Sequence, residues 1–181
     1  MDGTVIDRAL PQDYRHPQTS IYDTESAMTQ TAIIHDYPLT RSGKVIDFVT
    51  NPRPLCAQSI QSEILEYDYD AGWVETQYMA PVEFTTPGGF LQGGFVAALL
   101  DDVISLPTMM RHRGEQGPAT LELSISYLDS VPYGRLFGKA WIVRMGRSIG
   151  FLEAELRDPA EKLLAKATTT IKVRPLRKAQ V

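Results

Sequence analysis

A glycine-rich turn followed by a pair of acids is the part of this sequence best suited to chemistry. Four glycines lie between Gly88 and Gly94, and the apolar segment that follows carries Asp101 and Asp102. Glycine has no Cβ, so its backbone can approach a ligand closely, and the first N–H groups of a helix have no partner within that helix. A helix that begins at this turn would therefore bind a negatively charged oxygen, and a nearby carboxylate could deliver water to a polarised carbonyl.

The segment after the turn has the pattern of a helix that is covered on more than one side. At about 100° per residue, one stripe is wholly apolar. It consists of Phe95, Val96, Leu99, Val103, Leu106 and Met110. Asp101 points to the opposite side, among small and apolar side chains rather than Lys and Glu. We therefore expect a second covering layer there, most simply a second copy of the chain, with Asp101 in the cleft between the two copies. Pro107 removes one helical hydrogen bond and predicts a kink or an end near Leu106.

Composition limits the classes of function that remain. The chain has 181 residues, 43% of them hydrophobic, and a net charge of −4, which suits one domain with a core and an appendage. The acidic balance argues against nucleic acid as a partner, and we expect no membrane insertion because no apolar run approaches about 20 residues. The single cysteine, Cys56, excludes an intrachain disulfide, and the absence of a charged-then-apolar leader favours the cytoplasm. His16, His35 and His112 lack ligand spacing, so we expect neither a metal nor another cofactor.

The chain divides into an extension and a globular domain. Residues 1–52 form a partly irregular N-terminal extension in which Asp, Gln, Thr, Ser and Pro interrupt any apolar period; it packs along the domain, reaches a partner or is mobile. The domain, residues 53–181, begins with a short helix in 55–65 that leads into a strand, and a second strand spans 72–82. After the central helix, strands are expected at 120–128, 136–144, 149–157 and 163–173, with sequence neighbours paired antiparallel. The predicted fold class is α+β, one helix against a curved antiparallel sheet.

Three motifs give the chain a family resemblance. They are Gln92-Gly93-Gly94 followed by Asp101, Gly117-Pro118-Ala119-Thr120 leading to Ile125-Ser126-Tyr127, and Arg144-Met145-Gly146-Arg147-Ser148. Together they resemble the hotdog-fold acyl-CoA thioesterases of the phenylacetic-acid-degradation type, over about residues 55–175. The resemblance implies a hotdog fold, in which the sheet wraps a central helix. It also implies homodimers joined sheet to sheet, which often pair into tetramers, with the active site between subunits.

The resemblance also implies roles for the residues of the turn and helix. Gly93 N–H would be the donor of the oxyanion hole, in a Gln92-Gly93-Gly94 motif where the family has His-Gly-Gly. Asp101, nine positions after Gln92 as in the family, would be the general base or nucleophile supplied by the partner chain. Asp102 is a further candidate for the substrate site, because the two acids could exchange roles. The Gln92 amide can donate a hydrogen bond but cannot shuttle a proton.

Other candidate residues lie outside the helix. Thr120 takes the place of a Ser or Thr that helps to position water in the family. Arg144 and Arg147, together with Ser148, are candidates for contacts with the nucleotide phosphates of CoA. Thr86 stands where the family has an Asn, which changes one polar contact to the substrate or the acid.

The resulting hypothesis is hydrolysis of an acyl-CoA or aryl-CoA thioester, without a cofactor, by a homodimer or a dimer of dimers. The main alternative is a non-catalytic hotdog protein that binds acyl-CoA as a sensor or pathway accessory, which the altered Gln92 and Thr86 positions favour. A hotdog hydratase or dehydratase ranks last, because no histidine lies on or before the helix stripe.

Overall fold

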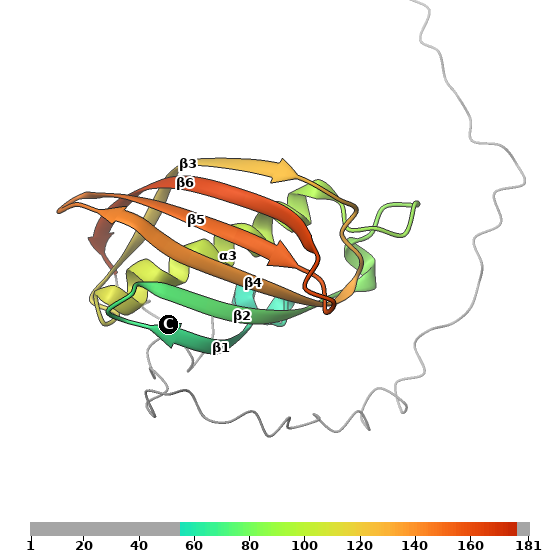
Figure 1. Ribbon diagram of the computed structural model, residues 1–181, viewed down its shortest axis with the longest axis horizontal. Helices are drawn as coiled ribbons and strands as arrows, with labels where there is room; N and C mark the ends of the chain where they lie inside the picture. Colours follow the sequence, from blue (N-terminus) through green and yellow to red (C-terminus); the bar gives the residue numbers. More distant parts are fainter. Residues whose placement is uncertain (1–54, 177–181) are drawn as a thin grey trace, which may run out of the picture. The chain divides into compact units, whose positions relative to one another are not determined.

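A six-stranded antiparallel sheet curves around one long helix (Figure 1). The computed structural model describes residues 55–176, so the predicted extension, residues 1–52, lies outside the described residues, as do His16 and His35. In chain order the elements are α2 (Leu55–Ser59), β1 (Glu63–Asp68), β2 (Trp73–Ala80), the 3-10 helix η1 (Val82–Phe84), α3 (Gly93–Arg111), β3 (Gln116–Tyr127), β4 (Gly134–Met145), β5 (Ile149–Arg157) and β6 (Leu163–Pro175). Each helix and strand predicted within this range is present.

The strand order places β3 away from its neighbours in sequence. The order is β1-β2-β4-β5-β6-β3, with every neighbouring pair antiparallel. The expectation that β3 pairs with β4 is therefore wrong, because β3 pairs with β6 and β4 pairs with β2. The connection from β3 to β4 is tied to the turn before α3, where Leu91 N–H donates to Val131 O at 2.8 Å, so it cannot close as a hairpin. As a result, β1 and β3 are the two edges of the sheet.

The core lies between α3 and the inner face of the sheet. Alternate residues of the strands supply its fully buried side chains, as the period of two requires. They include Val74, Tyr78, Leu136, Ala140, Leu152, Leu156 and Ile171. Gly138 lets α3 approach β4 closely, because a Cβ there would lie 2.9 Å from Thr76 Oγ1 and 3.4 Å from Val103 Cβ.

The buried side of α3 is wider than the predicted stripe and differs from it at one end. Five of the six stripe residues are buried, but Phe95 is 36% exposed, so its assignment to the core is wrong. Phe95 lies in the first turn, where it stacks on Phe84 with ring centroids 3.9 Å apart. Ile104 and Thr108, on the side assigned to Asp101, are also buried, at 1% and 0% exposure.

Pro107 neither ends the helix nor interrupts it. α3 continues through Pro107 to Arg111, so of the predicted kink or end near Leu106 the end is wrong. Proline removes a single helical hydrogen bond. The Pro107 side chain is buried between buried neighbours on both sides, and this packing offsets the lost bond.

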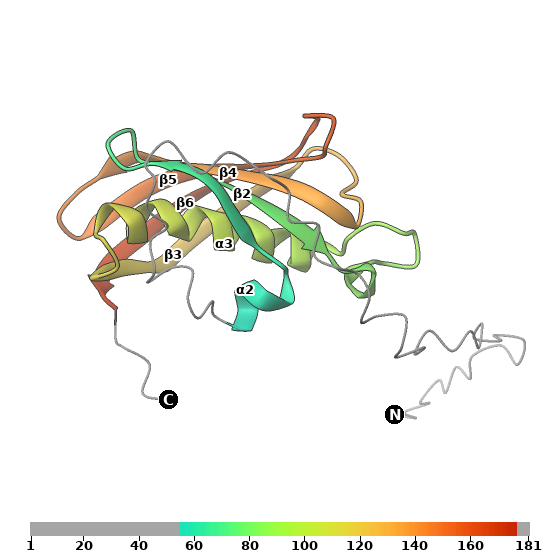
Figure 2. The same ribbon diagram turned by 90° about the horizontal axis from the view of Figure 1, so that it is seen from below.

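One side of α3 remains accessible to solvent. Gly94 and Ala98 are exposed on it, while Asp101 and Ser105 are half-buried, and we call these four residues the open flank of α3. Figure 2 shows α3 against one face of the sheet, with α2 on the same side. The acid and the start of the helix are thus both within reach of a ligand.

The length of α3 bears on the expectation that the chain does not insert into a membrane. It has 19 residues, and an 18-residue window within it has a mean hydropathy of 1.3, so by length and composition this helix could cross a membrane. Half of the apolar window is buried inside the fold. α3 is the core helix around which the sheet curves.

Candidate active site

Asp101 and Thr120, which were predicted to share one site, lie in contact in the structure. Thr120 Oγ1 donates a hydrogen bond of 3.0 Å to Asp101 Oδ1. Thr120 faces α3 because its partner on β6 is Ile171, a fully buried residue of the inner face. The carboxylate is half-buried on the open flank of α3, so it is held in place and still accessible.

Asp102 points to a different part of the molecule. Its Oδ2 accepts hydrogen bonds from Ser62 Oγ at 2.7 Å and from the Tyr78 hydroxyl at 3.1 Å. Burial raises the pKa of Tyr78 well above its ordinary value, and the negative charge of Asp102 raises it further. Consecutive helical residues differ by about 100° in direction, which is why one acid faces β3 and the other faces β2.

Gln92 caps the start of α3 with its side chain. Its Oε1 accepts a 2.7 Å hydrogen bond from Gly94 N–H. A backbone N–H can only donate, so this bond places Oε1 on the side facing Gly94 N–H and leaves Nε2, a donor, on the other side of the side-chain amide. No described residue accepts a hydrogen bond from Gly93 N–H. The Gly93 N–H is therefore a donor at the positive end of the helix dipole, and the side-chain amide N–H groups of the cap residue Gln92 are further donors.

Tyr127 reaches the same glycine from β3. Its hydroxyl donates a 3.0 Å hydrogen bond to Gly93 O, and a Cβ on Gly93 would lie 3.5 Å from its ring. Tyr127 belongs to the Ile125-Ser126-Tyr127 motif, but the sequence by itself predicted no role for it. The signal available there was its alternation with Leu123 and Ile125, which places all three on the inner face of β3.

Thr86 closes the loop before the cap. Its N–H and its Oγ1 both donate to Phe90 O, at 2.8 and 3.2 Å. Thr86 thereby shapes the turn that leads to Gln92, and its side chain is half-buried.

The structure does not bring the predicted phosphate contacts near the start of α3. Arg144, Arg147 and Ser148 are exposed at the tip of the β4–β5 hairpin. Ser148 O accepts from Val173 N–H at 2.9 Å, at the end of the sheet where α3 finishes (Figure 1). Gln92 lies at the opposite end of the helix, so within one chain the two groups are far apart.

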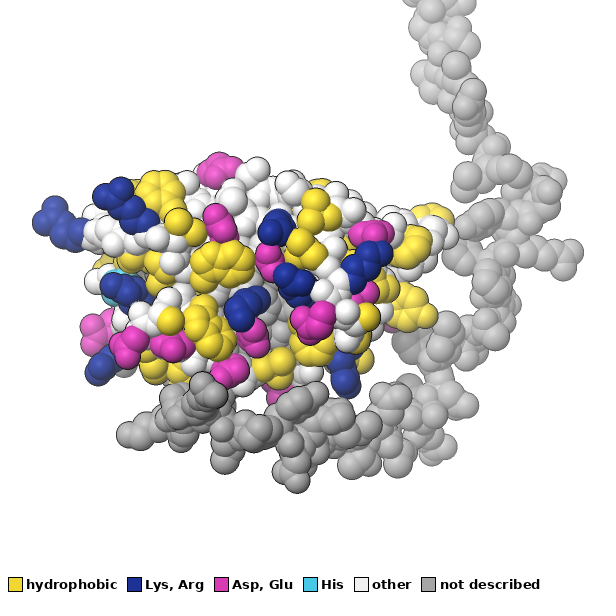
Figure 3. All heavy atoms as spheres, viewed as in Figure 1, with side chains coloured by type: hydrophobic (Ala, Val, Ile, Leu, Met, Phe, Trp, Pro, Cys, Tyr) yellow, Lys and Arg dark blue, Asp and Glu magenta, His cyan; other side chains and the backbone are white. Residues whose placement is uncertain are grey.

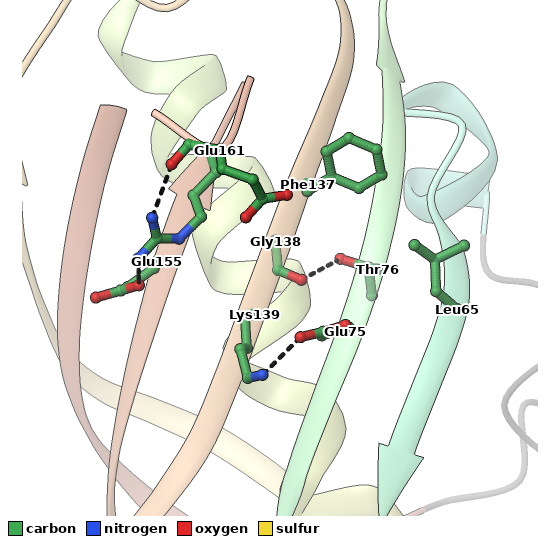
Figure 4. Close-up of a pocket in the computed structure, with 9 residues that line it drawn as sticks. Leu65, Glu75, Thr76, Phe137, Gly138, Lys139, Glu155 and Glu161 are labelled. Carbon is green, nitrogen blue, oxygen red and sulfur yellow. Dashed lines mark hydrogen bonds and ion pairs between the residues drawn. The ribbon is translucent and has the colours of Figure 1, made fainter. Parts of the chain in front are cut away.

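A hollow on the other face of the sheet does not take part in this site. It has a volume of about 300 Å³ and is lined by charged side chains of β2, β4 and β5 (Figure 4). Its charges neutralise one another, since Lys139 Nζ lies 2.6 Å from Glu75 and Arg157 Nη2 lies 2.5 Å from Glu155. Figure 3 shows the same mixture of acidic, basic and hydrophobic side chains over the sheet face. Within residues 55–176, no group of His, Cys, Asp and Glu is placed to hold a metal ion.

The single helix inside a curved antiparallel sheet, with an accessible acid on the helix flank, defines a hotdog protein. The sequence model of the thioesterase superfamily matches residues 88–165. A phenylacetic acid degradation-related protein from Ralstonia eutropha JMP134 is 34% identical over 67% of this chain and 91% of its own, with a TM-score of 0.61. The chain belongs to the thioesterase superfamily, and both the hotdog fold and the predicted resemblance are confirmed.

More distant structures share the fold. A protein from Streptococcus mutans UA159, solved bound to acetyl CoA, is 24% identical over 65% of this chain and 91% of its own, with a TM-score of 0.57. The PaaI protein of the E. coli phenylacetic acid degradation operon is 14% identical over 71% of this chain and 89% of its own, with a TM-score of 0.60. No curated protein sequence matches the chain.

Proposed function

We propose that this protein hydrolyses an acyl-CoA or aryl-CoA thioester to the free acid and CoA. The observation that carries the proposal is the Asp101 carboxylate, held by Thr120 Oγ1 at 3.0 Å on the open flank of α3. A carboxylate in this position has two possible roles in hydrolysis. It can activate water as a general base or attack the thioester carbon itself, and both routes remain open.

The start of α3 supplies the second requirement of thioester hydrolysis. Attack on the thioester carbon places negative charge on the carbonyl oxygen, and donors fixed in advance lower the energy of that state. Gly93 N–H and the side-chain amide N–H groups of Gln92 are such donors. The hydrogen bond from Gly94 N–H keeps the Gln92 side chain in place. Proton transfer through a histidine is not needed in this scheme, because Asp101 itself acts as the general base or the nucleophile.

One chain cannot complete the site alone. Gly93 and Asp101 are eight residues apart in α3, and eight residues of α-helix span about 12 Å. That separation is too long for one carbonyl to contact both the donor and the acid. We infer that the Asp101 of a second copy lies beside the Gly93 of the first, across the free edge of β3.

The CoA part of the substrate is supported by one structural neighbour and by charge. The Streptococcus mutans protein with this fold was solved bound to acetyl CoA. In the proposed dimer, Arg144 and Arg147 are candidate phosphate contacts, with Ser148 beside them. Replacing both arginines by alanine would then raise KM for CoA esters and leave kcat nearly unchanged, whereas an unchanged KM would remove them from the site.

The test is thiol release from short, medium, long and aromatic acyl-CoA esters, corrected for the exposed Cys56 thiol. Wild type should turn over at least one ester class, and Asp101→Asn should lower kcat by about 10³-fold while mass and melting temperature stay the same. Asp102→Asn is the matched comparison, because it changes the neighbouring acid on the same helix. A larger loss of kcat in Asp102→Asn than in Asp101→Asn would show that the two acids have exchanged roles.

The same experiment separates an enzyme from a binding protein. Tight binding of an acyl-CoA ester without turnover of any ester would overturn the proposed hydrolysis. The protein would then be an acyl-CoA-binding member of the fold, and the Gln92 and Thr86 positions would be the first candidates for the missing activity.

A further inference from the structure

We propose that Tyr127 is a positioning residue that fixes the oxyanion donor of this site. The inference rests on the proposed function and adds a residue to its machinery. Tyr127 lies at the end of β3, and its hydroxyl donates a 3.0 Å hydrogen bond to Gly93 O. Although the side chain is 53% exposed, its hydroxyl is directed at the first residue of α3.

The peptide unit between Gly93 and Gly94 is held at both ends by side chains. Its carbonyl oxygen accepts from the Tyr127 hydroxyl, and its N–H donates to Gln92 Oε1 at 2.7 Å. A planar peptide bonded at both ends cannot rotate without breaking one of the bonds. The Gly93 N–H belongs to the preceding peptide, between Gln92 and Gly93. Fixing the Gly93–Gly94 plane restricts the backbone angles of Gly93, and these angles set the direction of that N–H relative to the plane.

Restraint of this kind matters because two glycines stand in sequence. Glycine has the widest backbone freedom of any residue, so an unrestrained Gly-Gly pair would point its N–H groups in several directions. An oxyanion donor contributes most when it is already directed at the reacting oxygen. Tyr127 would provide this restraint from outside the helix, whereas Gln92 provides it from the cap.

The same strand also holds the acid. Thr120 and Tyr127 both face α3 from β3, since their β6 partners Ile171 and Ala165 are fully buried on the inner face. Thr120 bonds to Asp101, and Tyr127 bonds to Gly93. A single edge strand therefore sets the positions of both the acid and the oxyanion donor along α3.

The experiment compares Tyr127→Phe with wild type in the full chain. This variant keeps the ring against Gly93 and removes only the hydroxyl. Tyr133→Phe is the control, since Tyr133 is similarly exposed, at 55%, and is assigned no role in the site. On the ester that wild type hydrolyses fastest, Tyr127→Phe should lower kcat about five- to tenfold with KM unchanged, the scale of one neutral hydrogen bond. An unchanged kcat, or a change in KM alone, would overturn the proposal.

Hydrogen exchange of the Gly94 amide gives a readout that does not need turnover. Tyr127→Phe should speed this exchange several-fold by NMR, because the peptide then loses one of its two side-chain hydrogen bonds, and Tyr133→Phe should not. An unchanged exchange rate would contradict the positioning role even if kcat fell. If wild type hydrolyses no ester, the proposed hydrolysis fails, and the exchange rate alone decides whether Tyr127 fixes the peptide.

Discussion

Two adjacent acids in α3 have different surroundings, and this difference separates their roles. Asp101 is bonded to Thr120 on the open flank, whereas Asp102 is bonded to Ser62 and Tyr78 beneath it. A carboxylate that accepts from Ser62, just before β1, and from Tyr78 in β2 is suited to holding α3 in register with the sheet. A carboxylate with one donor and an accessible second oxygen is suited to chemistry.

The buried Tyr78 gives a prediction about stability at high pH. Burial and then the charge of Asp102 raise the pKa of Tyr78, so the folded chain keeps its proton where the unfolded chain loses it. The unfolded state then binds fewer protons above about pH 10, and the free energy of unfolding falls as pH rises through that range. Tyr78→Phe should make this alkaline decline shallower, and should cost about 1 kcal/mol at pH 7 because Asp102 loses a donor.

Urea unfolding between pH 7 and pH 11 measures both effects. Tyr133→Phe serves as the control, because Tyr133 is exposed and should leave the slope of the wild type unchanged. If the free energy of unfolding fell equally steeply with pH in Tyr78→Phe and in wild type, the alkaline loss of stability would not come from Tyr78.

At the level of the element, α3 begins with an unusual cap that depends on a glycine. Ser, Thr, Asp and Asn are the preferred caps, and Gln92 takes their place by folding its longer side chain back to Gly94 N–H. A Cβ on Gly94 would lie 2.8 Å from Gln92 Oε1, so any larger residue there displaces the cap.

Because of this geometry, Gly94→Ala should have opposite effects in two backgrounds. With Gln92 present, alanine displaces the cap and lowers the free energy of unfolding. In Gln92→Ala no cap remains to be lost, so alanine should stabilise the helix by a few tenths of a kcal/mol. The coupling between the two positions should be about 1 kcal/mol, measured by urea unfolding of the double-mutant cycle.

Gly88→Ala is the matched glycine control, since its Cβ would meet only Thr86 Oγ1 at 3.6 Å. Additive effects of Gln92→Ala and Gly94→Ala would show that the cap contributes nothing.

At the level of the whole molecule, the strand order brings the proposed site to an edge of the sheet. β3 has β6 on one side only, and Leu121, in its bulge, is 57% exposed. Asp101 is bonded to Thr120, the residue just before that bulge. A second copy joined at this edge would cover both the apolar side chain and the acid.

Leu121→Lys should therefore dissociate the proposed dimer and abolish turnover together, because buried charge opposes association and each chain lacks half of the site. Leu55→Lys is the control, because Leu55 is 80% exposed on α2, away from β3. Sedimentation equilibrium and thiol release on the same samples measure the two properties. A monomeric variant with full turnover would place the whole site in one chain.

Local sequence patterns determined most of the elements. The apolar period of residues 93–111 predicted the helix, and alternation with turn residues predicted the strands, because both patterns depend on near neighbours in the chain. The glycine turn and the acid nine positions after Gln92 likewise identified the candidate site and the family resemblance. The helix period also predicted that Asp101 lies opposite the apolar stripe, and Asp101 is half-buried on the open flank.

Only the tertiary structure decided how distant segments meet. It pairs β3 with β6, holds Phe95 outside the core and carries α3 through Pro107. It also directs the Tyr127 hydroxyl to Gly93 and separates Arg147 from Gln92 within one chain. These features come from contacts between residues far apart in sequence, and local periodicity carries no information about which strand, ring or helix end will lie opposite another.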